Sequence, residues 1–258
     1  MNVLALKLLL APLIIGSASL AGRRWGPAVS GWIVGMPFTS GPVVFFVALS
    51  HGVTFAESSA LGVLSGGISL VLYALTYAWV AVRFPWYVSL VGSFLVFSLS
   101  TFYLQTVTVS LWFIVPVVAL AITVGLVLMP KGEVEPGESK LSQWDIPVRI
   151  LIGTSFILLI TGIAPFIGSR MTGLLTTIPL YVTILSIFAH RDHGPAAAAH
   201  VLRGLLYGMF AFTGFFLVLS LLIEQTSLGV SFGLAVLTAL TVQGTSLFIL
   251  RKLHGQKK

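Results

Sequence analysis

Two prolines, Pro37 and Pro179, interrupt apolar segments where a helix break would create polar chemistry. Each lies near the middle of a run long enough to cross a bilayer. Proline removes a backbone hydrogen bond and displaces the carbonyl four residues earlier, and in hydrocarbon such a carbonyl must face protein, water or a ligand. We interpret the breaks either as a substrate-binding site near the bilayer midplane or as kinks that only shape packing. Four hydroxyl residues lie beside them: Thr39, Ser40, Thr176 and Thr177.

Arg203 is a further candidate for substrate binding. It lies about seven residues inside an expected helix over 196–222, which is about 10 Å along the helix axis. A buried arginine in a membrane segment suggests a functional site, and its guanidinium can bind a carboxylate or phosphate through two hydrogen bonds. The alternative is a side chain that extends to the lipid headgroups.

Two His-Gly pairs are expected at helix ends. They predict either helix caps, with glycine in the left-handed conformation, or a gating or proton-sensing function of the histidines. His190 and His200 lie in the same region as the second pair, but their spacing does not predict the convergent ligands that a metal requires. We therefore expect no metal and no cofactor. The pairs are His51-Gly52 and His193-Gly194.

The prolines and the His-Gly pairs occupy equivalent positions of an internal repeat. Residues 26–66 match residues 168–208 without gaps at a constant offset of 142, with ten identities in 41 positions. Most of the identical residues are glycine, proline or histidine, which control backbone geometry and chemistry. The sequence therefore predicts a duplicated fold.

Composition places the chain in a membrane. Hydrophobic residues make up 57% and charged residues 8%, with a mean hydropathy of +1.05, whereas soluble domains carry about 25% charged residues. The net charge of +7 comes from residues scattered singly between apolar runs, which does not predict a nucleic-acid interface. No nucleophile is paired with a base and no carboxylates cluster within a helix, so we expect no enzyme activity.

The expected fold is an all-α polytopic integral membrane helix bundle with about nine transmembrane helices. The repeat aligns the first four helices with the last four and leaves the fifth as a connector, which gives an inverted 4+1+4 repeat. The expected units are repeat 1 over 1–105, a connector helix and cytosolic linker over 106–146, and repeat 2 with a basic tail over 147–258. Runs of about 20 apolar residues predict the helices 3–22, 26–49, 54–79, 85–104, 107–129, 147–167, 170–189, 196–222 and 228–250.

Positive charges predict the orientation of this bundle. With nine spans, all lysines and arginines except Lys7 and Arg170 fall on the face that receives the C-terminus. Cytoplasmic loops of membrane proteins carry the excess of such residues. We therefore expect the N-terminus outside and the C-terminus in the cytoplasm.

Two segments resemble a short signature of GlpM-like small bacterial inner-membrane proteins. In those proteins a glycine and the proline six residues later lie in the second of about four helices, and the whole protein is about one copy long. The resemblance implies two such units fused through an added helix, located in the bacterial inner membrane, and implies no substrate or catalytic residue. The connector helix, the linker and the His-rich 190–200 segment depart from that pattern. The segments are Gly31-Trp-Ile-Val-Gly-Met-Pro37 and Gly173-Leu-Leu-Thr-Thr-Ile-Pro179.

Interrupted helices at equivalent positions of two inverted halves are typical of the substrate sites of secondary transporters. We therefore predict a small secondary transporter or permease, with its site beside Pro37 and Pro179 and with Arg203 as an anion clamp. Its partners are the lipid bilayer and a small solute that the sequence does not identify; a homo-oligomer is compatible with the composition. The alternative is a non-transporting membrane scaffold or assembly factor, which the shortage of buried polar residues favours.

Overall fold

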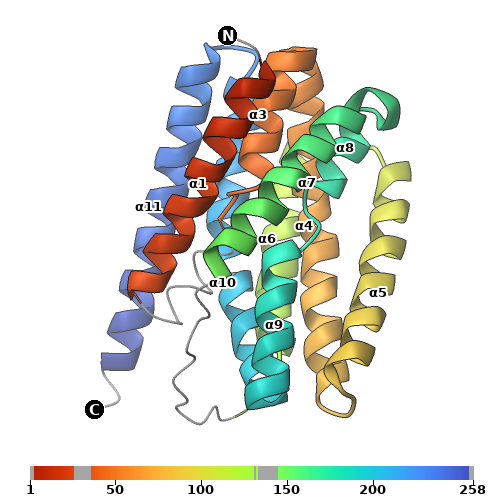
Figure 1. Ribbon diagram of the computed structural model, residues 1–258, viewed down its shortest axis with the longest axis vertical. Coiled ribbons are helices and arrows are strands. Elements are labelled where there is room, and N and C mark those ends of the chain that lie inside the picture. The colour runs from red at the N-terminus through yellow and green to blue at the C-terminus, as the bar shows by residue number, and fades with distance from the viewer. Residues whose placement is uncertain (1–2, 26–35, 131, 133–144, 256–258) are drawn as a thin grey trace.

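A computed structural model describes residues 3–25, 36–130, 132 and 145–255 of the chain, and its regular elements are helices (Figure 1). Among the described residues no strand is present. The helices are α1 (Val3–Trp25), α3 (Ser40–His51), α4 (Val53–Ala81), α5 (Trp86–Thr106), α6 (Leu111–Leu128), α7 (Asp145–Ile167), α8 (Ser169–Leu175), α9 (Leu180–His193), α10 (Pro195–Leu222) and α11 (Leu228–Gly255).

Seven segments of the described residues are long and apolar enough to cross a membrane: α4, α5, α6, α7 from Ile146, α8 with α9, α10 and α11 up to Thr245. Two shorter apolar helices, Leu4–Gly16 and Ser40–His51, accompany them. The prediction of an all-α membrane helix bundle is confirmed. Of the predicted helix 26–49, residues 26–35 lie outside the described part of the chain.

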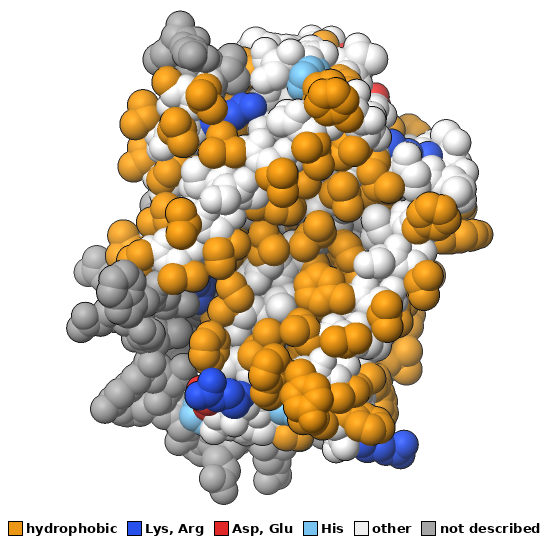
Figure 2. Space-filling model, turned by 45° about the vertical axis from the view of Figure 1, so that its right-hand side comes forward, with side chains coloured by type: hydrophobic (Ala, Val, Ile, Leu, Met, Phe, Trp, Pro, Cys, Tyr) orange, Lys and Arg blue, Asp and Glu red, His pale blue; other side chains and the backbone are white. Residues whose placement is uncertain are grey.

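The outer surface of the bundle matches a lipid environment. Large apolar side chains on α5 and α6 are exposed, for example Leu99 at 70% and Trp112 at 74%. Hydrophobic side chains cover the middle of the face seen in Figure 2, and most charged side chains on it lie near the two ends of the bundle. Contact with hydrocarbon explains why such large apolar side chains are exposed.

Each end of the bundle carries charged residues and is named here after one of them. The upper end in Figure 1, where α3 ends and α8 begins, is the Arg170 end, because Arg170 lies in the first turn of α8. At the lower end α4 and α9 finish, the latter with the exposed ion pair Arg191–Asp192 (Nε–Oδ1 3.3 Å); we call this the Arg191 end. Helix α1 starts at the Arg170 end and α11 finishes at the Arg191 end.

The centre of the bundle is built from α4 and α10, which contact each other, with α8 against α4 and α9 against α10. The backbones of α4 and α8 meet at two glycines. A Cβ on Gly62 would collide with the carbonyl oxygen of Arg170, and a Cβ on Gly173 with the carbonyl oxygen of Ser59. Small residues permit this close packing in membranes, so Gly173 positions the segment that leads to Pro179.

Candidate functional site

The predicted helix 170–189 is two helices, α8 and α9, because the chain leaves the helical conformation before Pro179. Pro179 has φ −79° and ψ 58°, which is an inverse γ-turn. The break before α3 contains the same pair of backbone hydrogen bonds at the offset of 142. These bonds are Phe38 N to Met36 O (2.8 Å) and Gly41 N to Pro37 O (2.9 Å), and Leu180 N to Ile178 O (2.8 Å) and Thr183 N to Pro179 O (3.0 Å).

Two threonine hydroxyls terminate α8. Thr176 Oγ1 donates to the carbonyl oxygen of Gly173 and Thr177 Oγ1 to that of Leu174, both at 2.6 Å. The carbonyl of Leu175, four residues before Pro179, accepts from the N–H of Ile178 at 3.1 Å. The carbonyl that the proline displaces therefore faces protein. Because the threonine hydroxyl hydrogens are already donated, their oxygens can act only as acceptors toward a ligand.

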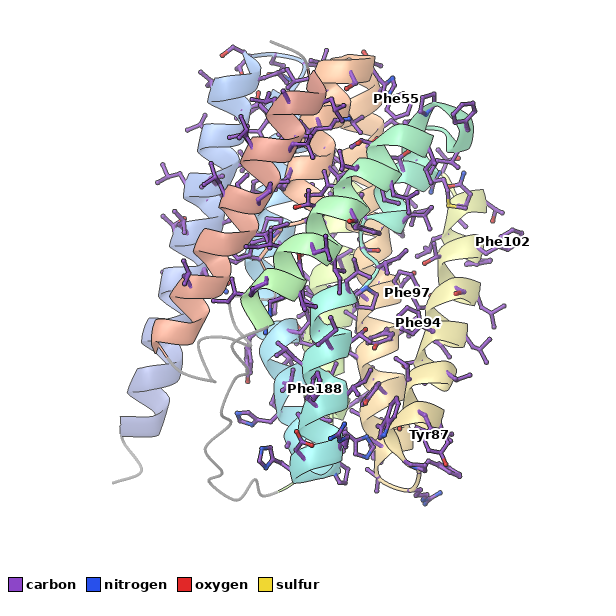
Figure 3. The ribbon with its side chains drawn as sticks, in the orientation of Figure 1. Phe55, Tyr87, Phe94, Phe97, Phe102 and Phe188 are labelled. Carbon is purple, nitrogen blue, oxygen red and sulfur yellow. The ribbon has the colours of Figure 1, made fainter. Side chains whose placement is uncertain are left out.

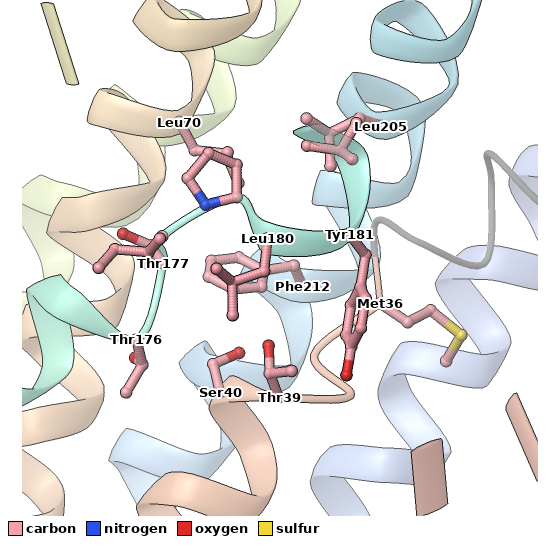
Figure 4. A pocket seen from close by; sticks show the side chains of 13 residues that line it. Met36, Thr39, Ser40, Leu70, Thr176, Thr177, Leu180, Tyr181, Leu205 and Phe212 are labelled. Atoms are coloured by element: carbon pink, nitrogen blue, oxygen red, sulfur yellow. The ribbon is translucent and has the colours of Figure 1, made fainter. Parts of the chain in front are cut away.

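The two breaks border one cavity of about 50 Å³, roughly the space of three to five water molecules. Five of the predicted site residues line this cavity. Pro37 is buried but is not one of the lining residues. In Figure 4 the hydroxyls of Thr39 and Ser40 point toward the segment around Leu180. None of the lining side chains carries a charge. The lining residues are Met36, Thr39, Ser40, Leu70, Thr176, Thr177, Ile178, Pro179, Leu180, Tyr181, Val182, Leu205 and Phe212.

Tyr181 also lines the cavity, although it was not among the predicted site residues. Its hydroxyl donates to the carbonyl oxygen of Arg149 in α7 at 3.1 Å. The hydroxyl reaches this position only because residue 153 is glycine, since a Cβ there would collide with it. The signal in the sequence is the repeat itself, because Tyr181 is the equivalent of Thr39 at the offset of 142.

Arg203 is not brought together with the other predicted site residues. Its guanidinium donates to the backbone oxygens of Met129 (3.0 Å), Leu126 (3.4 Å) and Pro130 (3.5 Å) at the end of α6. A cation at the C-terminus of a helix is stabilised by the unpaired carbonyls and the helix dipole. Arg203 also borders a separate cavity of about 130 Å³ with His200. The geometry therefore assigns Arg203 to anchoring the end of α6 rather than to the cavity between the breaks.

Both His-Gly pairs lie where two helices join without a loop. Gly52 has φ 90° and ψ 168°, and Gly194 has φ 83° and ψ −179°. Their N–H groups donate to Ala48 O at 3.1 Å and His190 O at 3.0 Å. Each glycine is the C-cap of the preceding helix, with a positive φ that is essentially restricted to glycine, although ψ near 180° differs from that of the left-handed helix. The gating function of His51 and His193 stays a prediction.

Comparisons of the chain with protein-family models, with curated proteins and with solved structures find no match. No activity of this chain is therefore inferred from similarity to a known protein.

Proposed function

We propose that the chain is a small secondary transporter or permease whose solute occupies the cavity between the two proline breaks. The observation that carries the proposal is the lining of that cavity, in which four hydroxyl residues, Thr39, Ser40, Thr176 and Thr177, meet apolar side chains. Ligand sites are typically apolar pockets with a few polar groups that fix orientation. Because Arg203 lies elsewhere and no lining side chain is charged, the solute is a small uncharged polar molecule rather than an anion.

We further propose that the two halves form an inverted repeat around this cavity. The contacts that support it are made by equivalent helices: α1 contacts α7, α4 contacts α10, and α5 packs on α4 as α11 packs on α10. In Figure 1 the helices of each equivalent pair run in opposite directions. Under this proposal α6 is the connector and the units are 1–105, 106–146 and 147–258, two GlpM-like units fused in tandem.

The proposed location is the bacterial inner membrane, with the Arg191 end in the cytoplasm and the N-terminus outside. Lys7 is the positive residue of α1 near its start, and Arg170 lies in the first turn of α8. Arg23 and Arg24 end α1, and Arg251 lies near the end of α11, which places them toward the Arg191 end. This distribution follows the positive-inside rule.

The size of the cavity favours a second candidate function, a non-transporting membrane scaffold or assembly factor. Drug-sized ligands occupy pockets of about 300–1,000 Å³, and about 50 Å³ holds only a few atoms of solute. A transporter would have to enlarge this cavity during its cycle, whereas a scaffold would not.

Solute permeability separates the two functions. The purified protein is reconstituted into liposomes, and shrinkage and recovery in glycerol and in urea are followed by light scattering. We expect faster recovery than in empty liposomes, and a reduction of at least about 5-fold with Thr39→Val, because Thr39 lines the cavity and its hydroxyl points toward the segment around Leu180 (Figure 4). Thr123→Val is the matched control because Thr123 is exposed and its hydroxyl bonds only within α6. Recovery equal to empty liposomes for these and a wider panel of neutral solutes would favour the scaffold.

A further inference from the structure

A column of polar side chains, four of them buried and His190 half-buried, runs from near the cavity toward the Arg191 end. Tyr73 and Tyr77 are one turn apart on α4, and the other members follow the i, i+3, i+7 spacing of one face of α9, where residues at such spacings are neighbours. We call this set the polar column. Its members are Tyr73, Tyr77, Thr183, Ser186 and His190.

Contacts between α4 and α9 join the column. Tyr73 Oη and Thr183 Oγ1 lie 2.7 Å apart in a buried hydrogen bond. The ring centroid of Tyr77 lies 6.3 Å from that of Tyr73 and 6.0 Å from that of His190. Leu70 and Val182, which line the cavity, are three residues before Tyr73 and one residue before Thr183. The column therefore starts beside the cavity and reaches the last turn of α9.

Three polar atoms of the column lack a hydrogen-bond partner among the described residues: Tyr77 Oη, Ser186 Oγ and His190 Nδ1. Tyr77 and Ser186 are fully buried, each with 0% exposure. A buried polar group without a partner costs about 1–3 kcal/mol, and buried water commonly satisfies such groups. Polar atoms separated by more than hydrogen-bond distance are often bridged by water. Water molecules are therefore the partners that fit this column.

Aromatic side chains of α5 separate the column from lipid. The ring of Phe94 packs edge-on against Tyr73, with centroids 5.3 Å apart, and Phe97 follows at 6.5 Å from Phe94. Figure 3 places Phe94 and Phe97 between α5 and the centre of the bundle, whereas Phe102 points outward. Water in the column would thus be enclosed by protein rather than exposed to hydrocarbon.

The equivalent positions of the other copy contain no polar side chain. All five are buried, and the ring of Phe215 lies 3.4 Å from the position that a Cβ on Gly41 would take. We call this set the apolar column; it runs from the cavity toward the Arg170 end, where α3 finishes. In the order of the polar column its members are Phe215, Leu219, Gly41, Val44 and Ala48.

We infer that the polar column is a hydrated half-channel that opens the cavity to the Arg191 end, and that the apolar column closes the opposite end. The inference rests on the proposed function, because that function is what assigns a solute to the cavity. The occupant is water, and a solute small enough for the cavity would follow the same route. Under this inference water reaches the cavity along the polar column only, because the equivalent positions of the other copy carry no polar side chains.

Cysteine accessibility tests this inference without a transport assay, because the chain contains no native cysteine. Single variants Ser186→Cys in the polar column, Val44→Cys at the equivalent apolar position and Thr177→Cys in the cavity are placed in liposomes of known orientation. Ag⁺ is added from one side, and the remaining thiol is measured with a fluorescent maleimide after denaturation. We expect Ser186→Cys and Thr177→Cys to react at least about 10-fold faster than Val44→Cys, and only from the Arg191 end.

Equal rates for Ser186→Cys and Val44→Cys, or reaction of Thr177→Cys from the Arg170 end alone, would overturn the half-channel. A second comparison uses Thr177→Cys with Ser186→Leu, which should slow the reaction at residue 177, and with Val44→Leu, which should not. If the labelling follows the expectation while no solute permeates, the half-channel stands and the transport proposal fails. If solutes permeate but labelling is symmetric, the transport proposal stands and the half-channel fails.

Discussion

Replacement of Gly173 by alanine should separate α8 from α4. The new Cβ would lie 2.9 Å from the Cα of Gly62 and 2.8 Å from the backbone nitrogen of Val63, and it would collide with the carbonyl oxygen of Ser59. Carbon atoms make favourable contacts at about 3.5–4.0 Å, so the helices must move apart by about 0.6–1.1 Å at Gly62. All three obstacles are backbone atoms, which no change of rotamer can remove.

The expected loss is at the upper end of the range for overpacked sites, about 3 kcal/mol. For a chain of this length this corresponds to a melting temperature lower by roughly 6–12 °C, measured by thermal unfolding of the purified protein in one detergent. Gly92→Ala in α5 is the matched control, because nothing lies within 4 Å of its Cβ position. Alanine is the better helix former by about 1 kcal/mol, so Gly92→Ala should melt at the same temperature or slightly higher. A melting temperature of Gly173→Ala within 2 °C of that of Gly92→Ala would refute the close approach of α4 and α8.

The remaining predictions use the same melting assay. Arg203→Met should lower stability by about 1.5–3 kcal/mol, because charged hydrogen bonds to the end of α6 are lost, and a change below about 0.5 kcal/mol would contradict this anchoring function. Tyr73→Phe removes the hydrogen bond to Thr183 and should lower the free energy of unfolding by only about 0.6 kcal/mol, the mean for interhelical hydrogen bonds in membranes. A loss above about 2 kcal/mol would indicate that Tyr73 belongs to a wider hydrogen-bond network. Gly194→Ala should lower the free energy of unfolding by about 1–3 kcal/mol, because φ is 83° there. Gly52→Ala should lower it by a similar amount. A large difference between the two variants would show that the two helix junctions are not equivalent.

The sequence predicted the break at Pro179 but not how the preceding helix ends. Proline chemistry identifies Pro179, and the structure ends α8 at Leu175. The reason is that the hydroxyls of Thr176 and Thr177 bond to the last carbonyls of α8. Thr and Ser hydroxyls compete with the helix for backbone partners, and this competition is invisible when a segment is read by hydropathy alone.

The contacts of Arg203 could not be predicted for a different reason. Its depth within α10 was expected from its distance to the helix start, but its partners are backbone oxygens at the end of α6, more than 70 residues away in sequence. No local pattern specifies such a long-range contact. The polar column escaped notice because single Tyr, Ser and Thr residues scarcely change the hydropathy of a membrane helix. The difference between the two copies at the offset of 142 was the available signal, for example Ser186 against Val44.

We expect the near contact between the backbones of Gly62 and Gly173 to act as a pivot. Closer approach of α8 to α4 is blocked there, so a relative movement of the two helices that keeps this contact would be a tilt about it. The 14 residues of α9 span about 21 Å by helical rise, and a tilt of about 5° therefore moves its far end by about 2 Å. The same tilt leaves the first turn of α8 almost stationary. Small rotations about the two glycines would thus produce their largest displacements at the far end of α9, where His190 lies.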